Sequence, residues 1–153
     1  TSLAIVRVRN LFAVAVLGVV LAGAGGLWSV ERQREREQEL LFIGNQFRTA
    51  IRSYYEQSPG TLKRYPMTLS ELVKDQRFLG VRRHLRQLYR DPMTGLPDWG
   101  LVMAPEGGIM GVYSQSAARP MKQGNFAERD AAFAGSESYG GWRFVYRPLM
   151  PRP

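Results

Sequence analysis

The sequence predicts an α+β fold in which one long N-terminal helix packs on a small antiparallel sheet. Three features predict it: an uninterrupted apolar run at residues 11–28 (LFAVAVLGVVLAGAGGLW), apolar side chains at helical spacing over residues 40–54, and short apolar segments separated by turn residues in the second half of the chain. Residues 29–39 contain no proline or glycine. We therefore expect one helix, with a transmembrane half and an amphipathic half.

The apolar run is long enough to cross a membrane. Its 18 residues span roughly 27 Å as a helix, close to the thickness of the hydrocarbon core. Arg7 and Arg9 precede it, and basic residues beside a first span favour a cytoplasmic N-terminus. The run exceeds the core of a usual signal peptide and is followed by charged residues, so we expect it to be retained. This predicts a flank at residues 1–9 and a single membrane helix at residues 10–30.

Small residues in this helix suggest contacts with other membrane helices. Four glycines lie in the run, and small residues allow helices to approach closely in lipid. The alternative is a lone anchor that is rich in small residues. The residues expected to form the membrane and helix-contact surface are Leu11, Phe12, Val16, Gly18, Leu21, Gly25, Gly26 and Trp28.

The amphipathic continuation is expected over residues 31–58. Its first part, residues 31–39 (ERQREREQE), alternates in charge and predicts a solvated, ion-paired helix surface. An apolar stripe follows, which indicates a helix face packed on a folded head. Ser58-Pro59-Gly60 is expected to end the helix. The stripe consists of Leu40, Ile43, Phe47, Ile51 and Tyr54, with Ala50 beside it.

The head is expected at residues 59–147, with helical connectors ahead of a sheet. Thr68 and Glu71 have the spacing of a capping box and predict a short helix. Residues 82–88 are expected to form another helical turn or two, with Leu85 and Leu88 pointing inward. A further turn is expected near residues 128–133.

Three strands are expected in the head. Residues 99–103 and 109–114 read as a hairpin whose turn is Pro105-Glu106-Gly107-Gly108. Residues 139–146 (YGGWRFVY) read as a third strand, because large apolar side chains alternate along it. The proline-rich residues 148–153 are expected to be a flexible tail.

The chain offers little chemistry for catalysis or redox. It has no cysteine and one histidine, His84, and it contains no nucleotide-binding, zinc-protease or serine-hydrolase motif. We therefore expect neither an enzyme nor a resident cofactor. Asp91, Asp98 and Glu106 flank turns and could share a calcium ion, but acidic residues in turns more often cap their own backbone.

A basic surface is the remaining candidate contact site. The chain has a net charge of +8, which permits attraction to nucleic acid or anionic lipid, although a solvated basic surface is the simpler account and nucleic acid is not the expected partner. The candidate face, which could meet phosphate, an acidic partner or a neighbouring subunit, consists of Arg82, Arg83, Arg86 and Arg90.

Six motifs between Leu11 and Tyr146 carry a resemblance to a known family: LFAVAVLGVVLA, RERE-ELLFIG-QFR-AI--YYE-SPG, YP-TLSELVKD, RHLR-LYRDP-TG, WGLV and GGI-GVYS. With these motifs the sequence resembles the pseudopilins of type II secretion systems, which belong to the type IV pilin-like superfamily. It is most similar to the branch of the major pseudopilin.

The resemblance implies a structural subunit of a short periplasmic filament. It implies insertion in the bacterial inner membrane with the N-terminus cytoplasmic and the C-terminal domain periplasmic. The implied partners are other copies of the chain, other pseudopilins, membrane lipid, the prepilin peptidase, the inner-membrane assembly platform with its ATPase, and the outer-membrane secretin. The alternative is a singly anchored periplasmic or pilus-tip protein that binds DNA or an acidic partner.

Two departures from the family pattern are visible. Family members start with a small-residue cleavage site and a string such as Phe-Thr-Leu-Ile-Glu, whereas aligning LFAV places Arg9 or its neighbour at the glutamate. The acidic calcium loop of the major pseudopilin has no counterpart at Gly140-Gly141-Trp142. A minor pseudopilin, or a pilin of another machine, is therefore an open alternative.

Overall fold

The computed structural model describes residues 2–150, which divide into two compact units, one up to Glu35 and one from Arg36 onward. The helix α1 (Ser2–Glu56) supplies all of the described part of the first unit and the first 21 residues of the second. Residues 2–9 of the predicted flank belong to this helix, and residue 1 lies outside the described residues. No break occurs between Trp28 and Leu40, as expected for a segment without proline or glycine.

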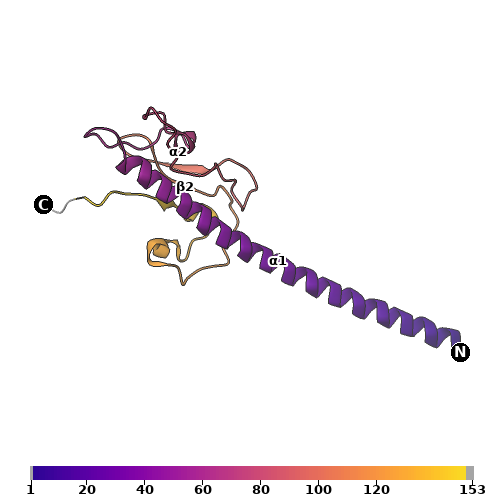
Figure 1. Ribbon diagram of the computed structural model, residues 1–153. Coiled ribbons are helices and arrows are strands. Elements are labelled where there is room, and N and C mark those ends of the chain that lie inside the picture. The colour runs from indigo at the N-terminus through magenta and orange to yellow at the C-terminus, as the bar shows by residue number, and fades with distance from the viewer. Residues whose placement is uncertain (1, 151–153) are drawn as a thin grey trace. The chain divides into compact units, whose positions relative to one another are not determined.

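The second unit is built around a small sheet that covers one face of α1. Within residues 2–150 the sheet has three antiparallel strands in the order β1 (Gly100–Met103), β2 (Ile109–Tyr113) and β3 (Phe144–Val145). Figure 1 shows β2 alongside the last turns of α1. The predicted α+β fold, with a long helix packed on an antiparallel sheet, is confirmed.

The hairpin between β1 and β2 follows from its turn residues. Gly107 and Gly108 have φ values of 97° and 88°, which glycine adopts without steric penalty. A side chain at Gly108 would also collide with Tyr65. The register pairs Gly100 with Tyr113 and shifts between Val102 and Met103, where the strand is irregular.

The third strand is much shorter than predicted. Residues 139–141 form a 3₁₀ turn, η2 (Tyr139–Gly141), because the Trp142 N–H donates to the Tyr139 carbonyl across 3.0 Å rather than to a neighbouring strand. Among the described residues of this segment, Phe144 and Val145 pair with β2, and the Tyr146 N–H donates to the Met110 carbonyl across 2.9 Å. The prediction of a strand over residues 139–146 is therefore wrong at its start. Trp142 and Phe144 are buried in the core.

The short helix α2 (Ser70–Val73) forms where it was predicted, but without the expected cap. Its N-cap residue is Leu69, which makes no side-chain cap hydrogen bond. The Glu71 carboxylate instead accepts hydrogen bonds from the Met67 N–H at 2.7 Å and the Tyr54 hydroxyl at 3.1 Å. The carboxylate thus ties α2 to α1 rather than closing a capping box with Thr68.

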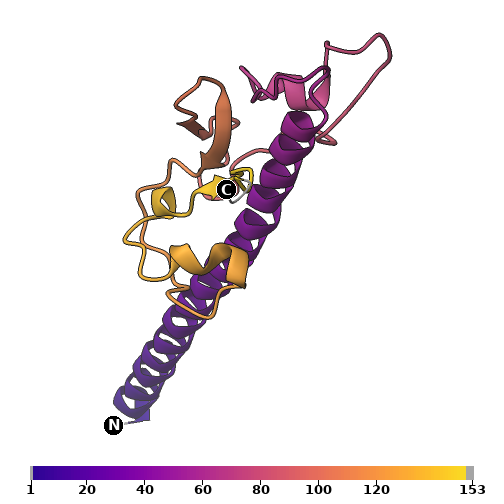
Figure 2. The same cartoon turned by 90° about the vertical axis from the view of Figure 1, so that its left-hand side faces the viewer.

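The helical turn predicted at residues 82–88 does not form. The N–H groups of His84 and Leu85 both donate to the Leu72 carbonyl across 2.8 Å, so they are not available for a helical ladder. Leu85 is buried as predicted, but Leu88 is 49% exposed. The turn expected near residues 128–133 is present as the 3₁₀ helix η1 (Glu128–Phe133), which Figure 2 shows beside α1.

Candidate functional site

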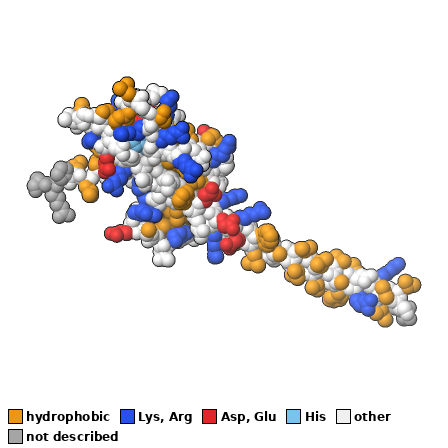
Figure 3. All heavy atoms as spheres, viewed as in Figure 1, with side chains coloured by type: hydrophobic (Ala, Val, Ile, Leu, Met, Phe, Trp, Pro, Cys, Tyr) orange, Lys and Arg blue, Asp and Glu red, His pale blue; other side chains and the backbone are white. Residues whose placement is uncertain are grey.

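The N-terminal part of α1 exposes its apolar side chains. This helix is long and apolar enough to cross a membrane, and none of its most apolar stretch is buried. Figure 3 shows hydrophobic side chains gathered along it, in contrast to the mixed surface of the second unit. A surface of this composition is stable in lipid or against other apolar surfaces, and its exposure to water is costly.

The glycines in this segment meet no side chain within the described chain. A Cβ added at Gly18, Gly23, Gly25 or Gly26 would have no atom within 4 Å. Each glycine weakens a helix by about 1 kcal/mol relative to alanine. Packing inside residues 2–150 therefore gives no reason for these glycines.

The amphipathic stripe on α1 forms the helix side of the core, as predicted. The side chains of Leu40, Ile43, Phe47, Ile51 and Tyr54 are all buried. Gly44 continues this face, where an added Cβ would overlap the ring of Phe144 in β3. A glycine on the stripe thus lets the sheet approach the helix closely.

A buried glutamate, Glu37, extends the stripe toward the N-terminus. Its Oε1 accepts hydrogen bonds from the Tyr139 hydroxyl at 2.8 Å and from the Met121 N–H at 2.6 Å, with the Lys122 N–H at 3.3 Å. The prediction of a solvated charged face over residues 31–39 is therefore wrong at Glu37. Its position three residues before Leu40 was the available signal.

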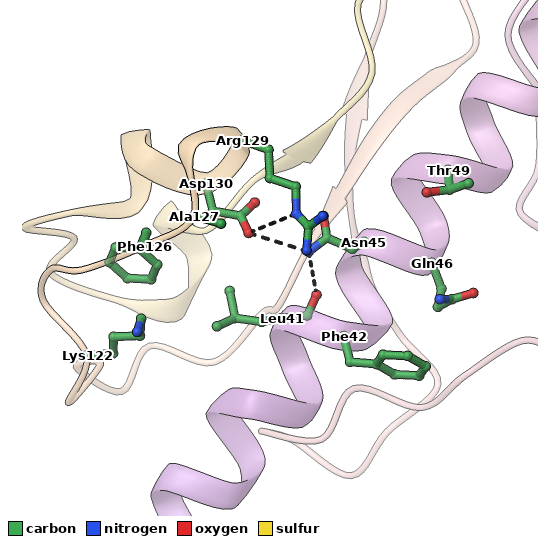
Figure 4. Close-up of a pocket in the computed structure, with 10 residues that line it drawn as sticks. All are labelled: Leu41, Phe42, Asn45, Gln46, Thr49, Lys122, Phe126, Ala127, Arg129 and Asp130. Carbon is green, nitrogen blue, oxygen red and sulfur yellow. Dashed lines mark hydrogen bonds and ion pairs between the residues drawn. The ribbon is translucent and has the colours of Figure 1, made fainter.

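A second polar contact joins α1 to η1. Arg48 Nη1 lies 2.8 Å from Asp130 Oδ1, and Asn45 Nδ2 donates to Asp130 Oδ2 across 3.4 Å. Beside this ion pair, an open groove of about 520 Å³ runs between α1 and residues 122–130. Figure 4 shows Phe42 and Gln46 on the helix side, with Lys122 and Phe126 across the groove.

A third polar cluster lies at the C-terminal end of α1. Arg77 donates to Asp75 Oδ2 at 2.7 Å, to the Tyr54 carbonyl at 2.9 Å and to the Ser58 hydroxyl at 2.9 Å, and its guanidinium lies 3.5 Å from the centre of the Tyr54 ring. Carbonyls in the last turn of a helix lack partners within the helix. Arg77 donates to one of these carbonyls, that of Tyr54, and adds a cation–π contact with the Tyr54 ring.

The same cluster perturbs the ionisation of its members. Burial raises the pKa of Asp75, but the hydrogen bonds from Arg77 and His84 outweigh burial and hold that pKa well below its ordinary value. Burial disfavours the charged form of Arg77 as well and so lowers its pKa, but the hydrogen bond to Asp75 outweighs burial and raises that pKa overall. Asp75 is therefore a buried carboxylate that is ionised and fully paired.

The His84 imidazole lies between a serine and an aspartate and contacts both. Its Nδ1 lies 2.7 Å from Ser53 Oγ, and its Nε2 lies 2.9 Å from Asp75 Oδ2. Ser53 sits inside α1, where helical hydrogen bonds occupy the nearby backbone N–H groups that could serve as an oxyanion hole, and Gln57 donates to its hydroxyl. Asp75 is shared with Arg77. The arrangement therefore supports a structural link between α1 and the loop after α2 rather than an activated nucleophile. No sequence motif indicates this link, because its three residues lie far apart in the chain.

The calcium candidates are not brought together into a ligand set. Among the described residues no group of three or more His, Asp or Glu side chains could hold a metal ion. Asp91 is buried and caps its own turn, accepting hydrogen bonds from the Ser114 hydroxyl at 2.6 Å and the Met93 N–H at 2.8 Å. Asp98 and Glu106 are exposed.

The predicted basic residues lie on irregular chain instead of a helix face. Arg82, Arg83, Arg86 and Arg90 are all exposed. Arg90 donates to the Gly95 carbonyl at 3.2 Å. In the part of the chain that the structure describes, Arg82, Arg83 and Arg86 form no ion pair.

Compared with protein-family models, with curated proteins and with solved structures, the chain gives no match in any of the three. The arrangement of elements is nevertheless consistent with a pilin-like fold, because a long N-terminal helix packs on a small antiparallel sheet. The same helix carries a stretch that could span a membrane.

Proposed function

We propose that this chain is a pseudopilin-like subunit that polymerises into a filament of a type II secretion machine or a related pilus machine. The observation that carries the proposal is the division of α1 between two environments. One part of the helix has its stripe buried by a sheet, whereas residues 11–28 expose apolar side chains on every face.

The physics of this helix favours self-association. Outside lipid, an exposed apolar helix is costly, and packing against copies of itself removes the same surface from water. The glycines that meet no side chain among residues 2–150 would then face neighbouring helices, where small residues allow close approach. The resemblance to pseudopilins supplies the remaining elements: an inner-membrane anchor, a periplasmic head, and processing and assembly by the secretion machinery.

Site-specific crosslinking in membranes tests the proposal, because the chain has no cysteine of its own. Leu17→Cys and Leu21→Cys are introduced singly, and membranes from cells that also produce the secretion machinery are treated with a short thiol crosslinker. We expect ladders of crosslinked subunits. Leu62→Cys, at a more exposed position in the second unit, controls for random collision.

A second pair of variants separates assembly from folding. Gly25→Leu adds bulk where the described chain leaves open space, so we expect the second unit to stay folded while the crosslinked ladders are lost. Gly25→Ala should keep most of them. If Leu17→Cys and Leu21→Cys give only monomers in the presence of the machinery, the filament proposal is wrong.

A further inference from the structure

The loop that follows α2 carries two aliphatic side chains at its most exposed point. Leu79 is fully exposed and Val81 is 77% exposed. Figure 2 shows the chain standing out as a loop after α2, at the upper right. Single exposed aliphatic residues are normal on protein surfaces, so these two side chains alone do not indicate a binding site.

Arginines flank the aliphatic pair. Arg82, Arg83 and Arg86 are exposed and, among the described residues, form no ion pair. The guanidinium of Arg82 lies 4.1 Å from the centre of the Phe78 ring, which holds the charge beside the tip. The tip therefore combines exposed apolar surface with unneutralised positive charge.

The base of this loop is fixed by the cluster around Asp75. The Asp75 N–H donates to the Arg82 carbonyl across 3.0 Å, and the Asp75 carboxylate binds both Arg77 and His84. A loop with a closed base presents its tip with little conformational entropy left to lose on binding.

We propose that residues 78–86 form a membrane-docking loop for a bilayer that contains anionic lipid. Leu79 and Val81 enter the boundary between headgroups and acyl chains, and the arginines contact lipid phosphates. Aliphatic side chains beside clustered cations are the combination that binds such an interface, because apolar burial and attraction to the charged surface add.

Other occupants fit the loop less well. A second copy of the chain also carries a net charge of +8, so unpaired arginines would face a surface of the same sign. Single-stranded nucleic acid binds through aromatic side chains that stack on bases, whereas here the outermost residues are aliphatic and Arg82 lies over the one aromatic ring of the loop, Phe78.

A fluorescent label at the tip tests the proposal on the full chain. Leu79→Cys, in a chain without other cysteines, is labelled with an environment-sensitive dye and held in nanodiscs of phosphatidylcholine. Separate vesicles of phosphatidylcholine, or of equal parts phosphatidylcholine and phosphatidylglycerol, are then added. We expect a blue shift and a brighter signal with the anionic vesicles, and none with the neutral ones.

Two variants and one control assign the effect to the loop. Adding Arg82→Gln and Arg83→Gln together should weaken vesicle binding about thirtyfold, and Val81→Ser should weaken it about tenfold. The pair Arg147→Gln and Leu149→Ser, which removes an exposed cation and an exposed aliphatic residue elsewhere, should leave binding unchanged.

Several results would overturn the proposal. These are no response to the anionic vesicles, an equal response to neutral vesicles, or the same response to polyglutamate or duplex DNA in place of vesicles, which would assign the loop to an acidic macromolecule. Should the double arginine variant fold poorly, raising the salt concentration on the labelled chain gives the same test, because binding through arginines must then weaken.

Discussion

The Tyr139 hydroxyl donates a hydrogen bond to the Glu37 carboxylate across 2.8 Å, joining residues that lie 102 positions apart in the sequence. Both side chains are buried. The carboxylate also receives the Met121 N–H. One side chain on α1 therefore fixes two separate points of the irregular segment between β2 and β3.

Replacing Glu37 by alanine should destabilise the second unit markedly. The change leaves the buried Tyr139 hydroxyl and the partly buried Met121 N–H without their acceptor. An unsatisfied buried polar group costs about 1–3 kcal/mol, and a partly buried one costs less. We expect a loss of about 3 kcal/mol in the free energy of unfolding, measured by urea denaturation in detergent with near-ultraviolet circular dichroism.

The neighbouring acid Glu35 provides the matched control. It is exposed on the same helix, so Glu35→Ala should change the free energy of unfolding by less than about 0.5 kcal/mol. Equal effects of the two substitutions would show that helix charge, rather than the buried hydrogen bonds, controls stability.

Gly44→Ala should destabilise the chain even though alanine favours helix. Alanine gains about 1 kcal/mol in helix propensity, but its methyl group would overlap the buried ring of Phe144. Overpacking in a tight core costs about 1–3 kcal/mol, so we expect the unfolding midpoint in urea to fall.

Two further variants test whether the overlap is the cause. Gly25→Ala adds the same methyl group where no atom lies within 4 Å, and it should not lower the midpoint. Combining Gly44→Ala with Phe144→Leu should cost less than the sum of the two single changes. Strict additivity would contradict the contact.

The sequence was sufficient to predict α1 and its buried stripe, because helical spacing of large apolar residues leaves one face to bury. Phe47 and Tyr54 follow this rule directly. Glu37 occupies the next position of the same stripe, but a charged side chain is normally solvated, and its burial depends on donors 84 and 102 residues away. No local pattern reports such partners.

The connector after α2 was less predictable for a related reason. Arg82, Leu85 and Arg86 have helical spacing, yet the Leu72 carbonyl takes the N–H groups of His84 and Leu85. His84 also joins Asp75 to Ser53, nine and 31 residues away. Spacing alone cannot reveal backbone groups that are claimed by tertiary contacts.

Acid should weaken the cluster around Asp75. Because its pKa is lowered in the folded chain, Asp75 contributes stability that is complete above the unfolded-state pKa of about 3.9 and is lost as the pH falls toward the folded-state value. We expect the free energy of unfolding to drop below about pH 4, measured by urea denaturation across an acid series.

Asp75→Asn identifies this contribution. The amide leaves Arg77 without a charged partner, so stability at neutral pH should fall by about 3–5 kcal/mol, the usual effect of breaking a buried ion pair. The variant should also lose less stability between neutral and acid pH than the unchanged chain. Parallel acid profiles in both proteins would place the titrating group elsewhere.

Alkali should weaken the contact between Tyr65 and Tyr146, the residue that follows β3. Burial raises the pKa of Tyr65 to about 12, with a further contribution from Glu106, and its hydroxyl donates to the Tyr146 carbonyl at 3.1 Å. A raised pKa means that the stabilising form is the neutral one, fully present below the unfolded-state value of about 10 and lost as the pH rises through the folded-state value.

Tyr65→Phe tests this assignment by removing the titrating hydroxyl. We expect it to lower the free energy of unfolding by about 1 kcal/mol near neutral pH, through the lost hydrogen bond, and to flatten the loss of stability above about pH 10. Tyr146→Phe serves for comparison, because burial raises the pKa of Tyr146 as well, and its hydroxyl binds Glu56 instead. If only Tyr146→Phe flattens the alkaline profile, the group that controls alkaline stability is the Tyr146 hydroxyl and not Tyr65.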